Sequence, residues 1–185
     1  MAIHVAGICG SLREGSFNRG LLDVAVQLAP TGMELQIYTR LGDIPPYNDD
    51  VFQKGDPEPV ADLKKFIGGA DALLISTPEY NYGVPGVLKN AIDWASRPAG
   101  KSVLNRKPAA LMGCSPGLGG TIRAQHALRQ SFVFTDTHVM SQPEIKIPSA
   151  APLFDGSGKL TDENTRQHVK KFLEAFMVWI GRFKD

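Results

Sequence analysis

The sequence predicts an α/β fold in which helices cover both faces of a parallel sheet. Short apolar runs alternate along the chain with segments whose apolar residues recur at helical spacing. One run, 70–76, is almost continuously apolar, as is typical of a central parallel strand that is covered on both faces. Strands that alternate with helices are joined by right-handed crossovers, so they form a doubly wound sheet.

The first half of the chain contains three of the expected strands. The apolar run 3–8 is the first, and 33–38 alternates apolar with polar residues, as expected of a strand at the sheet edge. Helices are expected at 18–29, where Pro30 and Gly32 end the pattern, and at 60–67. The stretch between them, 41–59, contains four prolines and is expected to be a loop.

The second half continues the alternation. Helices are expected at 87–95 and 121–132, and strands at 108–113 and 137–147, the last interrupted near Pro143. Residues 161–164 begin a final amphipathic helix, whose buried face is marked by Phe172, Phe176 and Trp179. Five strands and about five helices match the flavodoxin-like plan with strand order 2-1-3-4-5, as a single domain over residues 1–185.

Composition narrows the class of protein. The chain has 185 residues, 43% hydrophobic and 21% charged, which is typical of a folded domain. A formal net charge of +1 gives no global attraction to nucleic acid or to anionic membranes. No run is long enough to span a bilayer, no signal peptide is visible, and Cys9 and Cys114 form no CxxC motif. We expect a cytoplasmic protein with two reduced thiols.

The stretch from Gly10 to Arg19 is the most informative, because a Gly- and Ser-rich loop leads from a strand into a helix. Backbone N–H groups and the helix N-terminus bind anions well, and Arg13 carries a guanidinium suited to phosphate. The Gly-Lys-Ser/Thr of a Walker A loop and the G-x-G-x-x-G of dinucleotide-binding folds are both missing. The remaining interpretation is a hydroxyl-rich monophosphate loop, of the kind that holds FMN in flavodoxin-like folds. The alternative is a plain turn in which Ser16 or Asn18 caps the helix.

Two further loops are expected at the same edge, because ligands of doubly wound sheets bind outside the carboxyl ends of the strands. The loop 77–86 carries Tyr80, Asn81 and Tyr82, whose polar and aromatic groups suit a flat ring system. The tyrosines are equally suited to packing against a helix or a second subunit. The Gly-rich loop 115–120 offers a bare backbone and one hydroxyl.

Together, residues 10–18 and 77–94 resemble the NADPH-dependent FMN reductase family, with the bacterial chromate- and quinone-reducing flavoproteins the most similar. The resemblance extends over residues 3–147. It implies bound FMN, NADPH or NADH as co-substrate, and homodimers or homotetramers assembled through the helix 87–95. Pro116 and residues 118–120 depart from the family pattern. By position, the FMN phosphate would be held by Ser11, Arg13, Ser16, Phe17 and Asn18, and the ribityl chain and ring by Pro78, Glu79, Tyr80, Asn81 and Ser115.

Other chemistries have less support. The four histidines show no metal-ligand spacing, and no G-x-S-x-G elbow is present. Lys101, Arg106 and Lys107 are expected in a solvated loop, with attraction of the NADPH 2′-phosphate as the alternative. No catalytic side chain is expected, because a flavin carries the redox chemistry itself.

The expected function is transfer of a hydride from NAD(P)H through the flavin to quinones, azo or nitro compounds or chromate, in a ping-pong cycle. The alternatives are a flavodoxin-type electron carrier and a flavin-free regulatory module. Flavodoxins are usually strongly acidic, so the net charge of +1 favours the enzyme.

Overall fold

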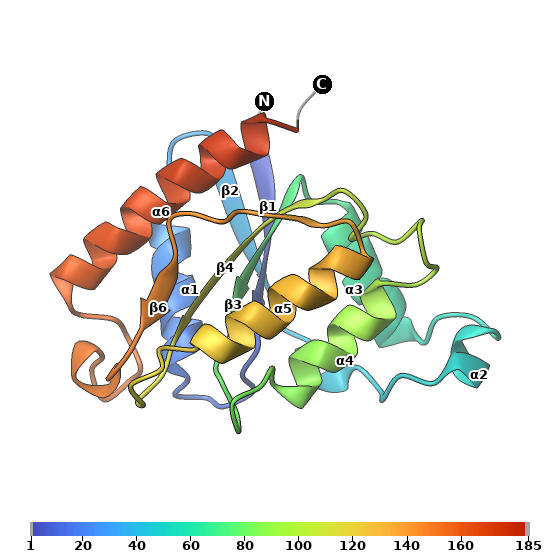
Figure 1. The fold of residues 1–185 in the computed structure, drawn as a ribbon, viewed down its shortest axis with the longest axis horizontal. Helices are drawn as coiled ribbons and strands as arrows, with labels where there is room; N and C mark the ends of the chain where they lie inside the picture. The colour runs from blue at the N-terminus through green and yellow to red at the C-terminus, as the bar shows by residue number, and fades with distance from the viewer. Residues whose placement is uncertain (1, 184–185) are drawn as a thin grey trace.

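A computed structural model describes residues 2–183, which form one parallel sheet with helices on both faces (Figure 1). The strand order β2-β1-β3-β4-β5 confirms the flavodoxin-like prediction. Every pair of neighbouring strands is parallel, with Val5 of β1 opposite Leu35 of β2 and Ala72 of β3. The strands are β1 (Ile3–Cys9), β2 (Met33–Tyr38), β3 (Ala72–Ser76), β4 (Pro108–Cys114), β5 (His138–Val139) and β6 (Ile145–Ile147).

The helices divide between the two faces according to the alternation of side chains along the strands. Val5 and Cys9 of β1 pack with α1 and α6 in one apolar cluster, whereas Ala6 and Ile8 pack with α3, α4 and α5 in the other. β3 and β4 are buried on both faces, as the apolar run of β3 predicts. The helices are α1 (Phe17–Gln27), α2 (Asp49–Phe52), α3 (Glu58–Gly68), α4 (Gly86–Ala95), α5 (Ile122–Phe134) and α6 (Glu163–Gly181).

The fifth strand position is filled by two short segments, β5 and β6. β5 pairs with the first residues of β4, and β6 pairs with the last, from Met112 to Cys114. Pro143 lies between the two segments, at the interruption that the sequence predicts, because proline cannot donate a ladder hydrogen bond.

The stretch 41–59 is more ordered than a loop, which corrects the expectation from its prolines. It contains a short 3₁₀ helix, Leu41–Asp43, and α2, whose N-cap Asn48 accepts a hydrogen bond from the Asp50 amide. The start of α6 agrees with the sequence, since Asp162 caps it by accepting from the Thr165 amide. Trp179, expected on the buried face of α6, is only half-buried and donates its indole N–H to the His138 carbonyl.

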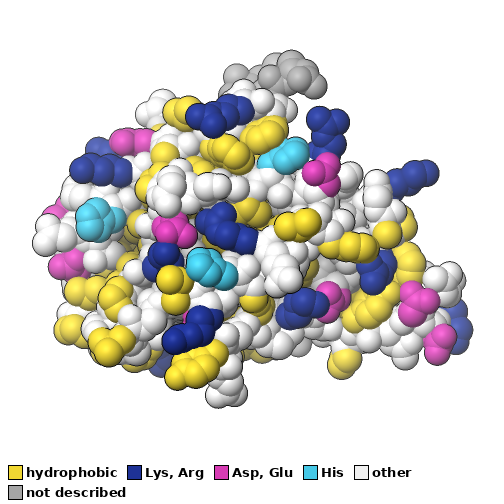
Figure 2. All heavy atoms as spheres, in the orientation of Figure 1, with side chains coloured by type: hydrophobic (Ala, Val, Ile, Leu, Met, Phe, Trp, Pro, Cys, Tyr) yellow, Lys and Arg dark blue, Asp and Glu magenta, His cyan; other side chains and the backbone are white. Residues whose placement is uncertain are grey.

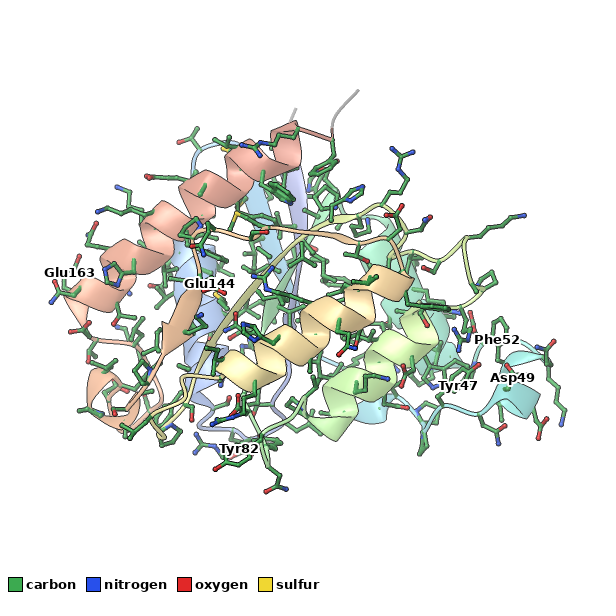
Figure 3. The ribbon with its side chains drawn as sticks, in the orientation of Figure 1. Tyr47, Asp49, Phe52, Tyr82, Glu144 and Glu163 are labelled. Carbon is green, nitrogen blue, oxygen red and sulfur yellow. The ribbon has the colours of Figure 1, made fainter. Side chains whose placement is uncertain are left out.

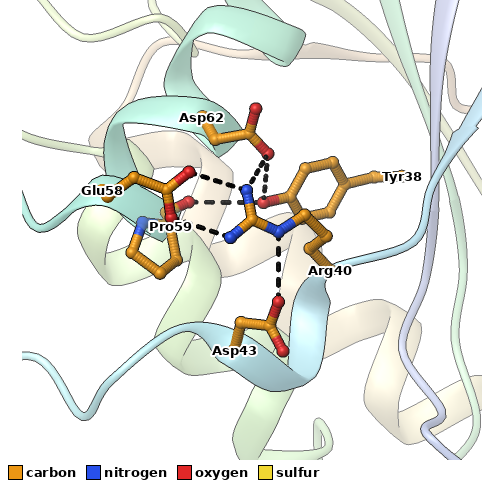
Figure 4. Close-up of polar contacts among 6 residues, drawn as sticks. All are labelled: Tyr38, Arg40, Asp43, Glu58, Pro59 and Asp62. Atoms are coloured by element: carbon orange, nitrogen blue, oxygen red, sulfur yellow. Dashed lines mark hydrogen bonds and ion pairs between the residues drawn. The ribbon is translucent and has the colours of Figure 1, made fainter.

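Arg40, just after β2, ties the end of that strand to the start of α3 (Figure 4). Its guanidinium donates to both carboxylate oxygens of Glu58 at 2.8 Å and to Asp43 at 3.1 Å, and it lies 3.4 Å from Asp62. Tyr38 completes the group by donating its hydroxyl to Asp62 at 3.1 Å. None of the helices described in residues 2–183 is both long and apolar enough to cross a membrane.

Candidate functional site

The loops after β1, β3 and β4 meet at the carboxyl edge of the sheet, at the bottom of Figure 1. They enclose a hollow of about 310 Å³, within the usual range for small-molecule sites. The hollow therefore lies where doubly wound folds bind their ligands. Its lining is formed by Ser11, Arg13, Ser16, Phe17, Asn18, Pro78, Glu79, Tyr80, Cys114, Ser115 and Pro116.

The first loop presents unpaired donors at the start of α1. Ser16 is the N-cap and accepts from the Arg19 amide at 3.3 Å, as the plain-turn interpretation requires. The amides of Phe17 and Asn18 in the first turn find no partner within residues 2–183, and this turn contains no acidic residue. Capping and anion binding are compatible, because one cap satisfies only part of the first turn.

Arg13 supplies a full positive charge beside these amides. Its guanidinium lies over the Phe17 ring, 5.3 Å from the centroid. No carboxylate among the described residues forms an ion pair with it. Ser11 is nearby, with its hydroxyl oxygen 3.4 Å from the Arg13 amide that donates to it and 3.3 Å from the Tyr80 hydroxyl. The loop thus holds an arginine that has no ion-pair partner among residues 2–183, next to amides without acceptors, which is the chemistry that binds phosphate.

Asn18 fastens this loop to the strand ends. Its side-chain N–H donates to the Cys114 carbonyl at 2.9 Å, and its oxygen accepts from the Cys114 amide at 3.0 Å and the Ser76 hydroxyl at 3.2 Å. The amide group thereby pairs with both backbone groups of Cys114, as a neighbouring strand would. Asn18 is only 4% exposed, so these bonds fix the distance between the first and third loops.

The second loop forms a tight hairpin. Tyr80 and Gly83 exchange backbone hydrogen bonds of 3.2 and 2.9 Å, and the two residues between them, Asn81 and Tyr82, both have positive φ. Positive φ at both central positions is the geometry of a type I′ turn, and it is strained for a tyrosine. Figure 3 shows Tyr82 at the tip of this loop, projecting from the body of the protein. The strain is consistent with a functional position.

Glu79 fastens the second loop to α5. Its carboxylate accepts from the amides of Arg123 and Ala124 at 2.8 and 3.1 Å and from the Arg123 guanidinium at 3.2 Å. The helix depends on this outside cap because its own N-cap, Thr121, has a left-handed conformation and makes no side-chain cap bond. The side chain of Glu79 is 8% exposed. Gly113 of β4 lets the start of the second loop and the residue before α5 lie close to that strand. A Cβ at this position would clash with the Thr77 carbonyl oxygen and the Thr121 hydroxyl.

A second hollow, of about 690 Å³, continues from the first. Both are lined by Glu79 and Ser115, so the two form one cleft. The Arg123 guanidinium lies over the Tyr82 ring at its rim, 4.1 Å from the centroid. Its lining is formed by Glu79, Asn81, Tyr82, Ser115, Gly117, Leu118, Gly119 and Arg123.

The structure brings the expected site residues into this cleft. Nine of the ten line the first hollow, and the tenth, Asn81, lines the second. Sequence reasoning missed Cys114, Pro116 and Arg123. A signal for Arg123 was present, because an arginine in the first turn opposes the helix dipole and needs a compensating partner.

Lys107 lies elsewhere, which corrects both interpretations for this residue, whereas Lys101 and Arg106 are exposed in the loop before β4, as the solvated-loop interpretation expects. Lys107 precedes the first residue of β4, at the opposite edge of the sheet from the cleft, and its ammonium donates to the Ala70 carbonyl. Burial lowers the pKa of this lysine. It is therefore neither in a solvated loop nor placed to attract a ligand at the cleft.

The two cysteines are buried, free thiols. Burial raises the pKa of Cys9, and it raises that of Cys114 far above its ordinary value, so both stay protonated and unreactive at neutral pH. Within residues 2–183, no group of three or more His, Cys, Asp or Glu side chains is arranged to hold a metal ion.

The donor set of the first hollow fits the phosphate of FMN. Two free first-turn amides, the Ser11 hydroxyl and the Arg13 guanidinium supply neutral and charged donors, and the one carboxylate in the lining, Glu79, is occupied by α5. The hairpin backbone and Tyr80 provide the polar and aromatic surface that a flavin ring requires.

Comparisons with known proteins agree with this geometry. Residues 3–152 match the family described as NADPH-dependent FMN reductase. The chain is 47% identical over 182 residues to an NAD(P)H-dependent FMN reductase of Pseudomonas aeruginosa, covering 98% of this chain and 97% of that protein. It is 40% identical over 184 residues to a quinone reductase of Escherichia coli, covering 98% and 97%.

Among solved structures, the fold is similar to FerB, a flavoenzyme NAD(P)H:(acceptor) oxidoreductase from Paracoccus denitrificans, with a TM-score of 0.87, 41% identity and 98% of each chain covered. The family match covers most of the chain, and the relatives match nearly all of it. The chain therefore belongs to the NADPH-dependent FMN reductase family and is an FMN-dependent NAD(P)H oxidoreductase.

Proposed function

We propose that this enzyme passes electrons from NADPH or NADH to quinones, and that azo compounds, nitro compounds and chromate are further acceptors. The supporting observation is a pair of hollows that share Glu79 and Ser115 in their linings: the first presents the donors that a phosphate requires, and the second is larger. Bound FMN would accept a hydride from the nicotinamide and deliver two electrons to the acceptor. The balanced reaction is NAD(P)H, a proton and a quinone giving NAD(P)⁺ and a hydroquinone.

Each wall of the cleft has a proposed task. Ser11, Arg13, Ser16 and the start of α1 at Phe17 and Asn18 hold the phosphate. The ribityl chain and the ring lie along Pro78, Glu79, Tyr80 and Asn81, and Ser115 contacts the flavin from the third loop. We expect one FMN per chain and much weaker binding of FAD, whose second phosphate and adenosine have no counterpart in a monophosphate loop.

We propose that donor and acceptor take turns at the flavin. If both reach the same face of the flavin, they cannot bind productively together, and the cycle is ping-pong. Double-reciprocal plots of rate against NADPH at several quinone concentrations should then be parallel. Intersecting lines would require a ternary complex and would reject the shared face.

Anaerobic mixing of the FMN-loaded protein with NADPH tests the enzymatic function directly. Rapid bleaching of the flavin followed by reoxidation on adding a quinone supports the proposal. A protein that binds FMN without bleaching would be a flavodoxin-type carrier, and one without flavin affinity would be a regulatory module.

We propose a homodimer formed through α4, with pairing into a homotetramer, in the cytoplasm. We expect Tyr82, Val84 and Val87 among the contacts of this dimer. Tyr82 is 74% exposed, whereas Val84 and Val87 are half-buried against the core of their own chain. The two free cysteines suit a reducing compartment. Light scattering at micromolar protein should give at least twice the monomer mass, and a charge at Val87 should dissociate the dimer.

A further inference from the structure

The second hollow has a surface that suits a flat ring. Leu118 and Tyr82 at its rim are 89% and 74% exposed, although both side chains are large and apolar or aromatic. Gly117 and Gly119 also line this hollow and carry no side chains that would fill it. In Figure 2, a basic side chain lies against exposed hydrophobic atoms along this lower edge of the molecule.

Arg123 adds a positive charge to this surface. The Tyr82 ring restrains its guanidinium, and Glu79 neutralises the charge only in part. The guanidinium is stacked on the Tyr82 ring at 4.1 Å, and the Arg123 side chain is 52% exposed. Stacking restrains the group without using its N–H donors. Of its five N–H groups, the hydrogen bonds among the described residues use one, to Glu79.

Glu79 does not cancel that charge, because most of its hydrogen-bonding capacity is directed elsewhere. The carboxylate accepts from two first-turn amides of α5 and compensates the positive end of that helix. Glu79 and Arg123 are the only charged residues among the eight that line the hollow. The exposed part of the charge therefore belongs to Arg123.

We infer that the second hollow selects acceptors that are planar and carry a negative charge, such as quinones with a sulfonate or an ionised hydroxyl group. The ring would lie against Leu118, the Tyr82 ring would hold the guanidinium in place, and the anionic oxygens would accept from the Arg123 guanidinium. This inference rests on the proposed quinone reductase function and specifies the substrate class of that cleft.

The test compares 1,2-naphthoquinone with 1,2-naphthoquinone-4-sulfonate in the wild type, Arg123→Gln and Arg123→Lys. Each acceptor is compared with itself across variants, so the difference in reduction potential between the two quinones cancels. In Arg123→Gln, kcat/KM for the sulfonate should fall about tenfold or more relative to the neutral quinone, the scale of a lost hydrogen bond to a charged group. Arg123→Lys should keep most of the preference.

A second variant distinguishes apolar contact with the acceptor ring from attraction of its negative charge. Leu118→Ser should reduce kcat/KM for both quinones by the same factor, because it removes apolar contact and no charge. Equal losses for both quinones in Arg123→Gln would overturn the inference and leave Arg123 as a support for Glu79. Slower flavin bleaching by NADPH together with equal losses for both quinones in Arg123→Gln would overturn it and assign this guanidinium to the donor's phosphates.

Binding can be measured without turnover, which distinguishes failure of this inference from failure of the proposed function. Titration of the oxidised, FMN-loaded protein with the sulfonate should perturb the flavin absorption, and Arg123→Gln should raise the Kd about tenfold. Such binding in a protein that reduces no quinone would reject the reductase function alone. An unchanged Kd in Arg123→Gln would reject the charge preference alone.

Discussion

Arg13 and Arg40 follow neighbouring strands at the same edge of the sheet, yet their surroundings differ. Arg40, after β2, is shared among Glu58, Asp43 and Asp62. Arg13, after β1, has no ion-pair partner among the described residues and lies instead beside free helix amides. Two arginines with similar positions in the fold thus differ in what remains for a ligand.

The pKa shifts of Arg40 and Glu58 reflect their mutual hydrogen bonds. Hydrogen bonds from Arg40 hold the pKa of Glu58 below its ordinary value, and those to Glu58 and Asp43 raise the pKa of Arg40. Carboxylates of the protein already compensate the charge of Arg40, so this arginine would attract an added anion only weakly. An arginine without a carboxylate partner, beside first-turn amides that the N-cap leaves free, is therefore the better indicator of a phosphate site.

The largest expected effect is the loss of FMN affinity when the Arg13 side chain is removed. Arg13→Ala should weaken FMN binding by roughly 1.5–3 kcal/mol, the range for hydrogen bonds to charged groups, and should leave riboflavin binding nearly unchanged. Fluorescence titration of the apoprotein with both flavins measures the two affinities.

Arg40→Ala is the matched control. It should lower the Tm while leaving FMN affinity as it was, because Arg40 contributes only to the junction of β2 and α3. Equal affinity of the wild type for riboflavin and FMN would contradict a role of Arg13 in phosphate binding. An equal loss of FMN affinity in Arg13→Ala and Arg40→Ala would contradict it as well.

The next effect concerns the rigidity of the loop that carries Arg13. Asn18→Ala leaves both backbone groups of Cys114 without their side-chain partner in a buried site, which should lower the free energy of unfolding by roughly 1–3 kcal/mol. Asn18→Asp retains the shape and the acceptor oxygen but loses the donor to the Cys114 carbonyl. Urea unfolding of the apoprotein should show losses in both variants. An unaffected apoprotein with weakened FMN binding would instead make Asn18 purely a ligand contact.

Local sequence patterns predicted most of the fold and the three loops of the cleft, for a physical reason, whereas the family resemblance supplied the individual site residues. Apolar periodicity reports burial, so β3, the interruption near Pro143 and the cap of α6 were all visible along the chain. The role of Asn18 was not visible, because its partner Cys114 is 96 residues away and no local pattern encodes that pairing. The helix α2 was obscured by prolines around it, although Asn48 followed by two aspartates is a start signal.

The smallest effect should appear only at high pH, in the Arg40 network. Burial, and then the hydrogen bond to Asp62, raise the pKa of Tyr38 to about 12. A tyrosine whose pKa is raised on folding stabilises the protein fully below its unfolded pKa, near 10, and this contribution is lost as the pH rises from there to the folded value. Wild type should therefore lose its stability advantage over Tyr38→Phe between pH 10 and 12, in urea unfolding measured at each pH. Because lysines titrate equally in both proteins, a constant difference across that range would mean that Tyr38 is not held protonated by Asp62 and its surroundings. Arg40 alone would then stabilise the junction of β2 and α3 through its ion pairs. Arg13 forms no such ion pair among the described residues.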